Sequence, residues 1–69
     1  MGIRKRLNSL GKKIKNLRID NDYSQEQLAE KAEMSREHIS CIERGKHPIN
    51  ILNLYKIADV FDVDIKELL

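Results

Sequence analysis

The chain has 69 residues, of which 41% are hydrophobic and 35% charged, and its formal net charge at pH 7 is +2. We expect one small domain with well-capped, tightly packed helices, because so small a core contributes only a marginal stability. No apolar run approaches the roughly 18 residues of a membrane span, and no apolar stretch follows the basic N-terminus, so we expect a cytoplasmic protein with no membrane partner.

Residues suited to enzymatic or metal chemistry are few. The single cysteine, Cys41, cannot form an intramolecular disulfide, and with only two histidines, His38 and His47, no cluster is spaced as a metal site. The sequence also contains no glycine-rich phosphate loop and no spacing of serine, histidine and aspartate that suggests a catalytic triad. We therefore expect a protein that is not an enzyme and that uses no cofactor, metal or small-molecule substrate.

Basic residues are concentrated at the start of the chain. Residues 1–18 hold seven lysines and arginines and no acidic residue, whereas residues 19–46 carry a net charge of −3 and the remainder −2. An isolated run of this kind is typical of a solvated tail. Beside a DNA-binding motif it instead supplies phosphate contacts, so its interpretation depends on the residues that follow.

The spacing of Leu10, Ile14 and Leu17 predicts a first helix from about residue 9 to about residue 21. Ile3 and Leu7 continue this spacing backwards. Residues 1–8 are therefore either a basic N-terminal arm or an extension of the helix. We favour an arm that is partly helical, followed by a domain at residues 9–69.

A pair of short helices is predicted at residues 25–45. Ser24 and Gln27 form a capping box that starts the first of them at Gln25. Its buried residues are Leu28, Ala29 and Ala32. Ala29 is informative, because two helices that cross steeply over a short turn leave no room for a larger side chain.

Ser35 caps the second helix of this pair, which ends at Gly45 and buries Ile39 and Ile42. The remaining side chains point outward: Arg36, Glu37, His38, Cys41 and Arg44. Reading base edges in a major groove requires such an exposed row of hydrogen-bonding side chains, beginning at a helix N-terminus and braced from behind. The pair therefore predicts a DNA-binding helix-turn-helix.

After a short loop, Asn50 caps a fourth helix. Its buried stripe is Ile51, Leu54, Ile57, Ala58 and Phe61. Leu52 and Tyr55 fall outside this stripe, which indicates either additional core or a contact surface.

The whole pattern resembles the helix-turn-helix domain of the Xre family, the phage Cro and repressor type of DNA-binding domain. The matching segments are GKKIKNLR at residues 11–18, SQ at 24–25, LA at 28–29, IS at 39–40, IERG at 42–45, IA at 57–58 and Val63. The resemblance implies an all-α fold, a compact five-helix bundle in which helices 2 and 3 form the helix-turn-helix. It also implies a transcriptional regulator that binds double-stranded DNA, as a homodimer on a palindromic operator.

The small size and the segment at residues 50–58 also resemble the controller proteins of restriction-modification systems. Three residues depart from the family pattern, because Asp22, Glu33 and Asp62 stand where glycine is common at helix ends. Glycine is favoured there because such caps often take positive φ, which aspartate tolerates better than glutamate. We expect a slightly strained turn at Glu33 in an otherwise retained fold.

Four outward residues are candidates for base contacts. Arg36 fits guanine, because its planar fork matches the two major-groove acceptors of that base; the alternative is a salt bridge to Glu33 or Glu37. Glu37 accepts from cytosine N4 or holds Arg36 in place. His38 reaches a phosphate or a base, or packs at the helix edge. Cys41 touches a thymine methyl group or, alternatively, acts as a redox switch.

Five residues are candidates for phosphate contacts: Gln25, Arg44, Lys46, Lys12 and Lys13. Gln25 matches the glutamine with which the family binds a phosphate and braces the recognition helix; its alternative role is local hydrogen bonding. The backbone amides around Gly45 are expected to assist in phosphate binding. The resemblance also implies an ion pair between Arg18 and Glu43 that fixes how the helices dock.

Apolar residues near the end of the chain predict a dimer interface. Asp64 and Glu67 form a capping box for a fifth, short helix. This helix and the fourth carry more apolar surface than so small a domain buries by itself, so we expect an isologous interface made of Leu52, Tyr55, Ile65, Leu68 and Leu69. The alternative function is an antitoxin-like or other protein-binding module that covers a partner with the same two helices.

Overall fold

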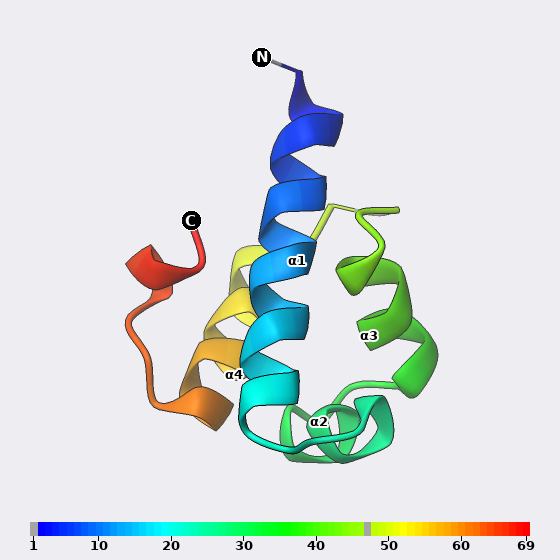
Figure 1. Cartoon of the computed structure of the whole chain (residues 1–69), viewed down its shortest axis with the longest axis vertical. Coiled ribbons are helices and arrows are strands. Elements are labelled where there is room, and N and C mark those ends of the chain that lie inside the picture. The colour runs from blue at the N-terminus through cyan, green and yellow to red at the C-terminus, as the bar shows by residue number, and fades with distance from the viewer. Residues whose placement is uncertain (1, 47) are drawn as a thin grey trace.

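The computed structural model describes residues 2–46 and 48–69, so Met1 and, within the predicted loop at residues 46–49, His47 lie outside the described residues. The described part of the chain contains four α-helices and one short 3-10 helix (Figure 1): α1 (Ile3–Asp20), α2 (Gln25–Lys31), α3 (Arg36–Glu43), α4 (Ile51–Phe61) and η1 (Ile65–Glu67). That part of the chain has no strand, which confirms the predicted all-α fold. None of its helices is long and apolar enough to cross a membrane.

The prediction of five α-helices is wrong, because the last element is a 3-10 turn of three residues. The backbone amide of Glu67 donates to the carbonyl oxygen of Asp64, three residues earlier, at 2.9 Å. The side chain of Asp64 accepts from the amide of Lys66 at 2.9 Å, and not from the amide of Glu67 as a capping box requires. This tighter turn replaces the expected α-helix.

The first helix, α1, begins at Ile3, about six residues before its predicted start, and has 18 residues. Residues 3–8 are therefore helical throughout, as an extension of α1. Ile3 and Leu7 continue the apolar spacing, and Asn8 packs against Gly45 in the turn that follows α3. The extension is thus in contact with another part of the fold.

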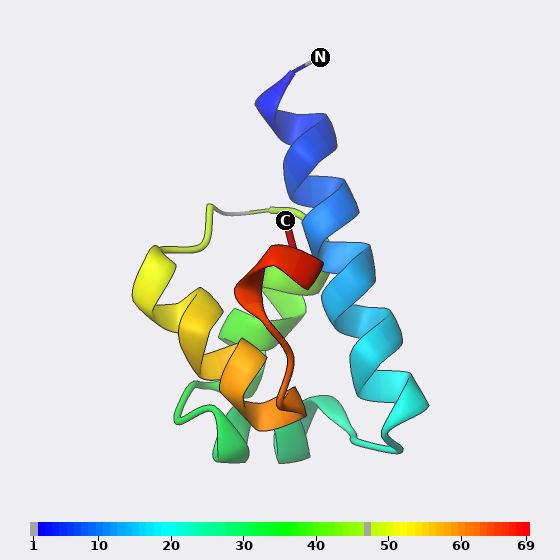
Figure 2. The same cartoon turned by 90° about the vertical axis from the view of Figure 1, so that its left-hand side faces the viewer.

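One core is shared by all the helices. The fully buried side chains come from the four α-helices and from the C-terminal segment: Ile14, Leu28, Ile39, Ile57 and Leu68. Figure 2 shows η1 lying in front of the helices, on the side of the molecule where it contacts α4. Leu68 was predicted at a dimer interface, and this is wrong, because it is only 1% exposed within its own chain. Ile65 is half-buried and packs against the same core.

Gly11 marks the closest approach of α1 to α3. A Cβ atom at this position would lie 2.5 Å from the carbonyl oxygen of Ile42 and 2.6 Å from that of Glu43. These neighbours are backbone atoms at the end of α3, which cannot move aside as a flexible side chain does. Only glycine therefore allows the two helices to lie at this distance.

The starts of α2, α3 and α4 follow the predicted caps. The side chain of Ser24 accepts from the amide of Gln27 at 3.0 Å, and the side chain of Gln27 accepts from the amide of Ser24 at 2.8 Å, which confirms the capping box of α2. The side chains of Ser35 and Asn50 accept from the amide three residues on, at 3.1 and 2.8 Å. Each cap satisfies an amide for which the helix itself has no acceptor.

Among the described residues, three other than glycine have a left-handed backbone: Asp22 (φ 60°), Glu33 (φ 57°) and Asp62 (φ 54°). They are the three positions at which glycine was noted as common, so the expected positive φ is confirmed. A residue with a Cβ atom costs roughly 1–2 kcal/mol in this region, and aspartate is better tolerated there than glutamate. Glu33 is therefore the most strained of the three.

Replacement of Glu33 by glycine should raise the free energy of unfolding by about 1 kcal/mol, because glycine adopts positive φ without this steric cost. Urea denaturation followed by circular dichroism measures the change. Glu30→Gly, at a solvent-exposed position within α2, is the matched control and should lower the same free energy by about 1 kcal/mol. Equal losses in the two variants would show that the turn at Glu33 is not strained.

Candidate nucleic-acid interface

The helix α3 is anchored by its inner side and exposed along its outer side. Ile39 and Ile42 lie in the core, whereas Arg36 and Glu37 are exposed. The other two candidates for base contacts, His38 and Cys41, are half-buried. Figure 1 shows α3 on one side of α1 and η1 on the other. The first turn of α3 therefore presents hydrogen-bonding side chains on a helix that is fixed from behind.

The guanidinium of Arg36 makes no ion pair among the described residues, where the salt bridge found joins Arg18 to Glu43. The alternative partners of Arg36, the carboxylates of Glu33 and Glu37, therefore do not hold it. Its five N–H donors form a rigid planar fork. This side chain is suited to a bidentate contact with an external acceptor.

The ion pair between Arg18 and Glu43 is present and semi-buried. Nε of Arg18 donates to Oε2 of Glu43 at 2.7 Å, and Nη2 donates to Oε1 at 3.2 Å. Nη1 of Arg18 donates to the backbone carbonyl oxygen of Tyr23 at 2.8 Å. The two side chains are 12% and 3% exposed. This fork-to-fork geometry joins the end of α1 to the end of α3 in one orientation.

Gln25, at the start of α2, is bound to the same carboxylate. Its Nε2 donates to Oε1 of Glu43 at 3.1 Å. Gln25 was predicted to contact a phosphate, and sequence reasoning missed this hydrogen bond, because the two residues are 18 positions apart and nothing local connects them. One amide hydrogen and the carbonyl oxygen of Gln25 remain for another partner. Glu43 thus joins α1, α2 and α3.

A tight turn ends α3. The amide of Gly45 (φ 68°) donates to the carbonyl oxygen of Ile42, and the amide of Lys46 donates to that of Cys41, each at 3.0 Å. These are the two hydrogen bonds of a Schellman motif. The expectation that backbone amides around Gly45 bind phosphate is therefore wrong, because both amides are engaged. The side chains of Arg44 and Lys46 are exposed beside them.

One face of α1 runs alongside α3. Three of its residues contact α3 or the turn after it: Asn8, Gly11 and Arg18. Arg4 and Lys15 share this face, because they lie three or four residues from its members. Sequence reasoning missed both as site residues. The helical spacing of these residues can be read from the sequence. Which face of α1 lies against α3 is shown only by the contacts.

Lys12 and Lys13 fall on different sides of α1. Successive residues turn by about 100° around an α-helix, so Lys12 flanks the face of Gly11, whereas Lys13 points away from it. Nζ of Lys13 donates to the backbone carbonyl oxygen of Leu69 at 3.1 Å. The structure therefore does not bring Lys13 to the α3 side, which argues against the predicted phosphate contact of Lys13.

Comparison with known proteins assigns this arrangement to a family. The helix-turn-helix family HTH_3 matches residues 14–68, which include α2, α3 and α4 in full. The chain belongs to the HTH_3 family of Xre type. In the terms of this family, α2 and α3 are the helix-turn-helix and α3 is its second helix.

Relatives within the family include two control proteins. C.MunI of a Mycoplasma species is 37% identical over 59 residues, which are 84% of this chain and 80% of that protein. C.BamHI of Bacillus amyloliquefaciens is 37% identical over 60 residues, which are 86% of this chain and 74% of that protein. The crystal structure of the restriction-modification controller protein C.AhdI from Aeromonas hydrophila matches with a TM-score of 0.89 and 30% identity, over 91% of this chain and 96% of that one.

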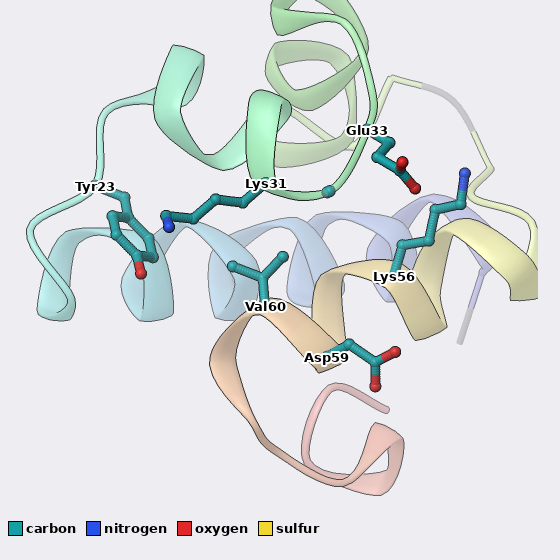
Figure 3. Close-up of a pocket in the computed structure, with 7 residues that line it drawn as sticks. Tyr23, Lys31, Glu33, Lys56, Asp59 and Val60 are labelled. Atoms are coloured by element: carbon teal, nitrogen blue, oxygen red, sulfur yellow. The ribbon is translucent and has the colours of Figure 1, made fainter.

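A concave surface lies between the end of α2 and α4. It has a volume of about 340 Å³, and Figure 3 shows Glu33 and Lys56 at one end and Lys31 beside Tyr23 at the other. Nζ of Lys31 lies 5.4 Å from the centre of the Tyr23 ring, a cation–π distance. Two lysines and two carboxylates, the second from Asp59, line the cleft, so its charges compensate one another.

The variant Arg18→Met leaves the buried carboxylate of Glu43 without its main partner, so it should lower the free energy of unfolding by about 3–5 kcal/mol. The double variant Arg18→Met/Glu43→Leu buries no unpaired charge and should be more stable than the single variant. Urea denaturation of both measures the difference. Lys15→Met, a change to an exposed lysine of the same helix, is the control and should stay within about 0.5 kcal/mol of the wild type. A double variant no more stable than Arg18→Met would contradict this account.

Proposed function

We propose that the protein is a transcriptional regulator that binds double-stranded DNA in a sequence-specific manner, with α3 in the major groove. The observation that carries the proposal is the outer side of α3. Its first turn exposes Arg36 and Glu37, and its last residue, Glu43, is held by hydrogen bonds from α1 and α2. A recognition helix needs both properties, because base-edge hydrogen bonds demand side chains whose backbone does not move. Membership of the HTH_3 family supports the same function.

The proposed contacts divide into two kinds. Arg36 reads guanine through a bidentate contact, and Glu37, His38 and Cys41 complete the base-reading surface. Phosphate contacts come from Gln25, Arg44, Lys46 and Lys12. Base contacts give specificity, while phosphate contacts supply affinity for every sequence and set the register on the duplex.

The variant Arg36→Ala should weaken binding to the cognate site by about 1–3 kcal/mol and relax the preference at one base pair in each half-site, because a bidentate base contact is lost. Selection of sites from random duplexes, followed by affinity measurements on the consensus and its single-base variants, tests this. Lys31→Ala is the matched control, since Lys31 lies over Tyr23 on another surface. An equal loss on all sequences would identify Arg36 as a phosphate contact.

We further propose that the protein acts as a homodimer on a palindromic operator. Three apolar side chains of α4 are more than half exposed: Ile51, Leu52 and Tyr55. Leu69, after η1, is 72% exposed, and Figure 2 shows η1 and α4 at the same side of the molecule. A two-fold interface across this surface would cover the apolar side chains of both copies. It would also place two copies of α3 about 34 Å apart, one turn of the duplex.

The regulatory role that fits best is the control of restriction-modification genes. C.MunI and C.BamHI are named control proteins, and C.AhdI a restriction-modification controller, and the chain spans most of the length of each. A regulator that binds its operator as a dimer responds to its own concentration through dimerisation and operator binding. This gives the proposed dimer a direct part in regulation.

The alternative function is a protein-binding module of antitoxin type, in which the exposed apolar residues of α4 cover a different protein. The same observation, the exposure of Leu52 and Tyr55, favours it. The two functions differ in their response to salt. Duplex binding falls steeply with salt concentration because counterions are released, whereas an apolar protein interface does not.

The variant Leu52→Asp should produce a folded monomer that loses at least tenfold in affinity for the palindromic operator and retains weak binding to a half-site, because a carboxylate cannot be buried unpaired in the interface. Analytical ultracentrifugation gives the mass, and titration of labelled duplexes gives the affinities. Ile19→Asp is the matched control, because Ile19 is similarly exposed but lies on α1. A Leu52→Asp variant with the mass and operator affinity of the wild type would exclude α4 from the interface.

A further inference from the structure

The turn that ends α3 is pressed against the N-terminal extension of α1. A Cβ atom at Gly45 would meet the side-chain oxygen of Asn8, and would lie 3.1 Å from both the Cα and the N atom of Asn8. Gly45 also has φ 68°, so this position requires glycine for its backbone conformation as well as for lack of space. The contact therefore fixes the position of the turn relative to the extension of α1. This places the first two turns of α1 beside the residues that follow the recognition helix.

A cleft of about 280 Å³ opens where they meet, lined by Arg4, Asn8, Arg44, Gly45 and Lys46. Among these described residues, three carry a positive charge and none is acidic. The cleft between α2 and α4 is different, because two carboxylates there stand against its two lysines. Three like charges around one concave surface repel one another, and an anion in the cleft would relieve that repulsion.

The donors of this cleft belong to side chains. The amides of Gly45 and Lys46 are used within the turn, so an anion must be held by the guanidinium groups, the ammonium group and the amide of Asn8. Arg44 is already oriented. Its Nε donates to the carbonyl oxygen of Ser40 at 3.3 Å, and its Nη2 lies 3.8 Å from Sγ of Cys41, which leaves Nη1 for a ligand. A planar guanidinium held by one edge is well suited to binding an oxyanion through the other.

We propose that this cleft is a phosphate-binding site for the DNA backbone, in which Arg4 and Asn8 of the α1 extension act together with Arg44 and Lys46. The inference rests on the proposed function, and adds to it a contact from a part of the chain outside the helix-turn-helix. Arg36 and Arg44 are eight residues apart on α3, which is about 12 Å along a helix at 1.5 Å per residue. The cleft therefore binds the DNA backbone beyond the end of the base-reading surface, and the extension of α1 lengthens the contact with the duplex.

Duplex DNA is the favoured ligand because the cleft is continuous with α3. Arg44 is the C-cap residue of α3, and its side chain touches Cys41, a candidate for base contact. A phosphate bound between Arg44 and Arg4 thus belongs to the same molecule as the bases that α3 reads. A free phosphate or nucleotide would use the same donors, and the experiment distinguishes these sources.

The test compares Arg4→Gln with Arg6→Gln. Both remove one positive charge from the first turns of α1, but Arg6 lines a different groove, beside Leu68 and Leu69. For Arg4→Gln the magnitude of the slope of log affinity against log salt should fall by about one unit. The ratio of wild-type to variant affinity should therefore decrease about 3.5-fold between 50 and 200 mM salt. The loss should be the same for cognate and unrelated duplexes. Arg6→Gln should keep the wild-type slope.

A second pair of variants inserts charge instead of removing it. Asn8→Asp places a carboxylate in the cleft and should weaken binding to every duplex, whereas Asn16→Asp, at an exposed position on the face of α1 that carries Lys13, should have a smaller effect. Thermal unfolding of all four variants establishes that they are folded. Duplexes with a neutral methylphosphonate at one position at a time then identify the bound phosphate. At one linkage per half-site, the methylphosphonate should weaken DNA binding by the wild type and leave DNA binding by Arg4→Gln unchanged.

The outcomes separate the inference from the function on which it rests. A wild-type slope in Arg4→Gln, or an equal loss of slope in Arg6→Gln, overturns the phosphate site while leaving DNA binding intact. A wild-type protein with no salt-dependent affinity for duplex DNA overturns both proposals. Competition by inorganic phosphate at millimolar concentration, with no linkage-specific effect on the duplex, shows a site for free anions and overturns the assignment to DNA.

Discussion

The carboxylate of Glu43 fixes the relative positions of three helices. It lies on α3 and accepts from Arg18 on α1 at 2.7 and 3.2 Å and from Gln25 on α2 at 3.1 Å. Because a buried carboxylate is costly unless its hydrogen bonds are complete, α3 cannot rotate or slide without leaving a charge unpaired. The apolar core supplies general cohesion, whereas this network determines the angle at which α3 faces outward.

Steric constraints act at the same contact and extend it along α1. Gly11 lets the backbone of α1 approach that of α3, and Gly45 lets the turn after α3 meet Asn8. Helical spacing then places Arg4 and Lys15 on the face that these contacts define. The helix α1 thus has a buried side that completes the core and an adjoining side that brings positive charge to the recognition helix. Charge repulsion along this side is tolerated because solvent, or an anionic partner, screens it.

Local features were predictable from the sequence, and long-range ones were not. The capping box of Ser24 and the caps Ser35 and Asn50 follow from short-range rules, and the structure contains each of them. The positive φ of Glu33 and the ion pair of Arg18 came from family resemblance. The bond from Gln25 to Glu43, the inward position of Leu68 and the side of α1 on which Lys13 lies all depend on how separate elements pack, which spacing alone does not encode. The prediction of a fifth α-helix was wrong for another reason, because Asp64 caps a 3-10 turn as readily as an α-turn.

The left-handed residues at the ends of α1, α2 and α4 affect the lifetime of the protein against proteolysis in a cell. A small domain has a free energy of unfolding of only about 0.05–0.15 kcal/mol per residue, so strain at Asp22, Glu33 and Asp62 removes an appreciable part of it. Each kcal/mol lost raises the unfolded fraction about fivefold, and proteases act on that fraction. Strain at Asp22 and Asp62, at the ends of α1 and α4, thus favours clearance of the protein without changing any residue of α3.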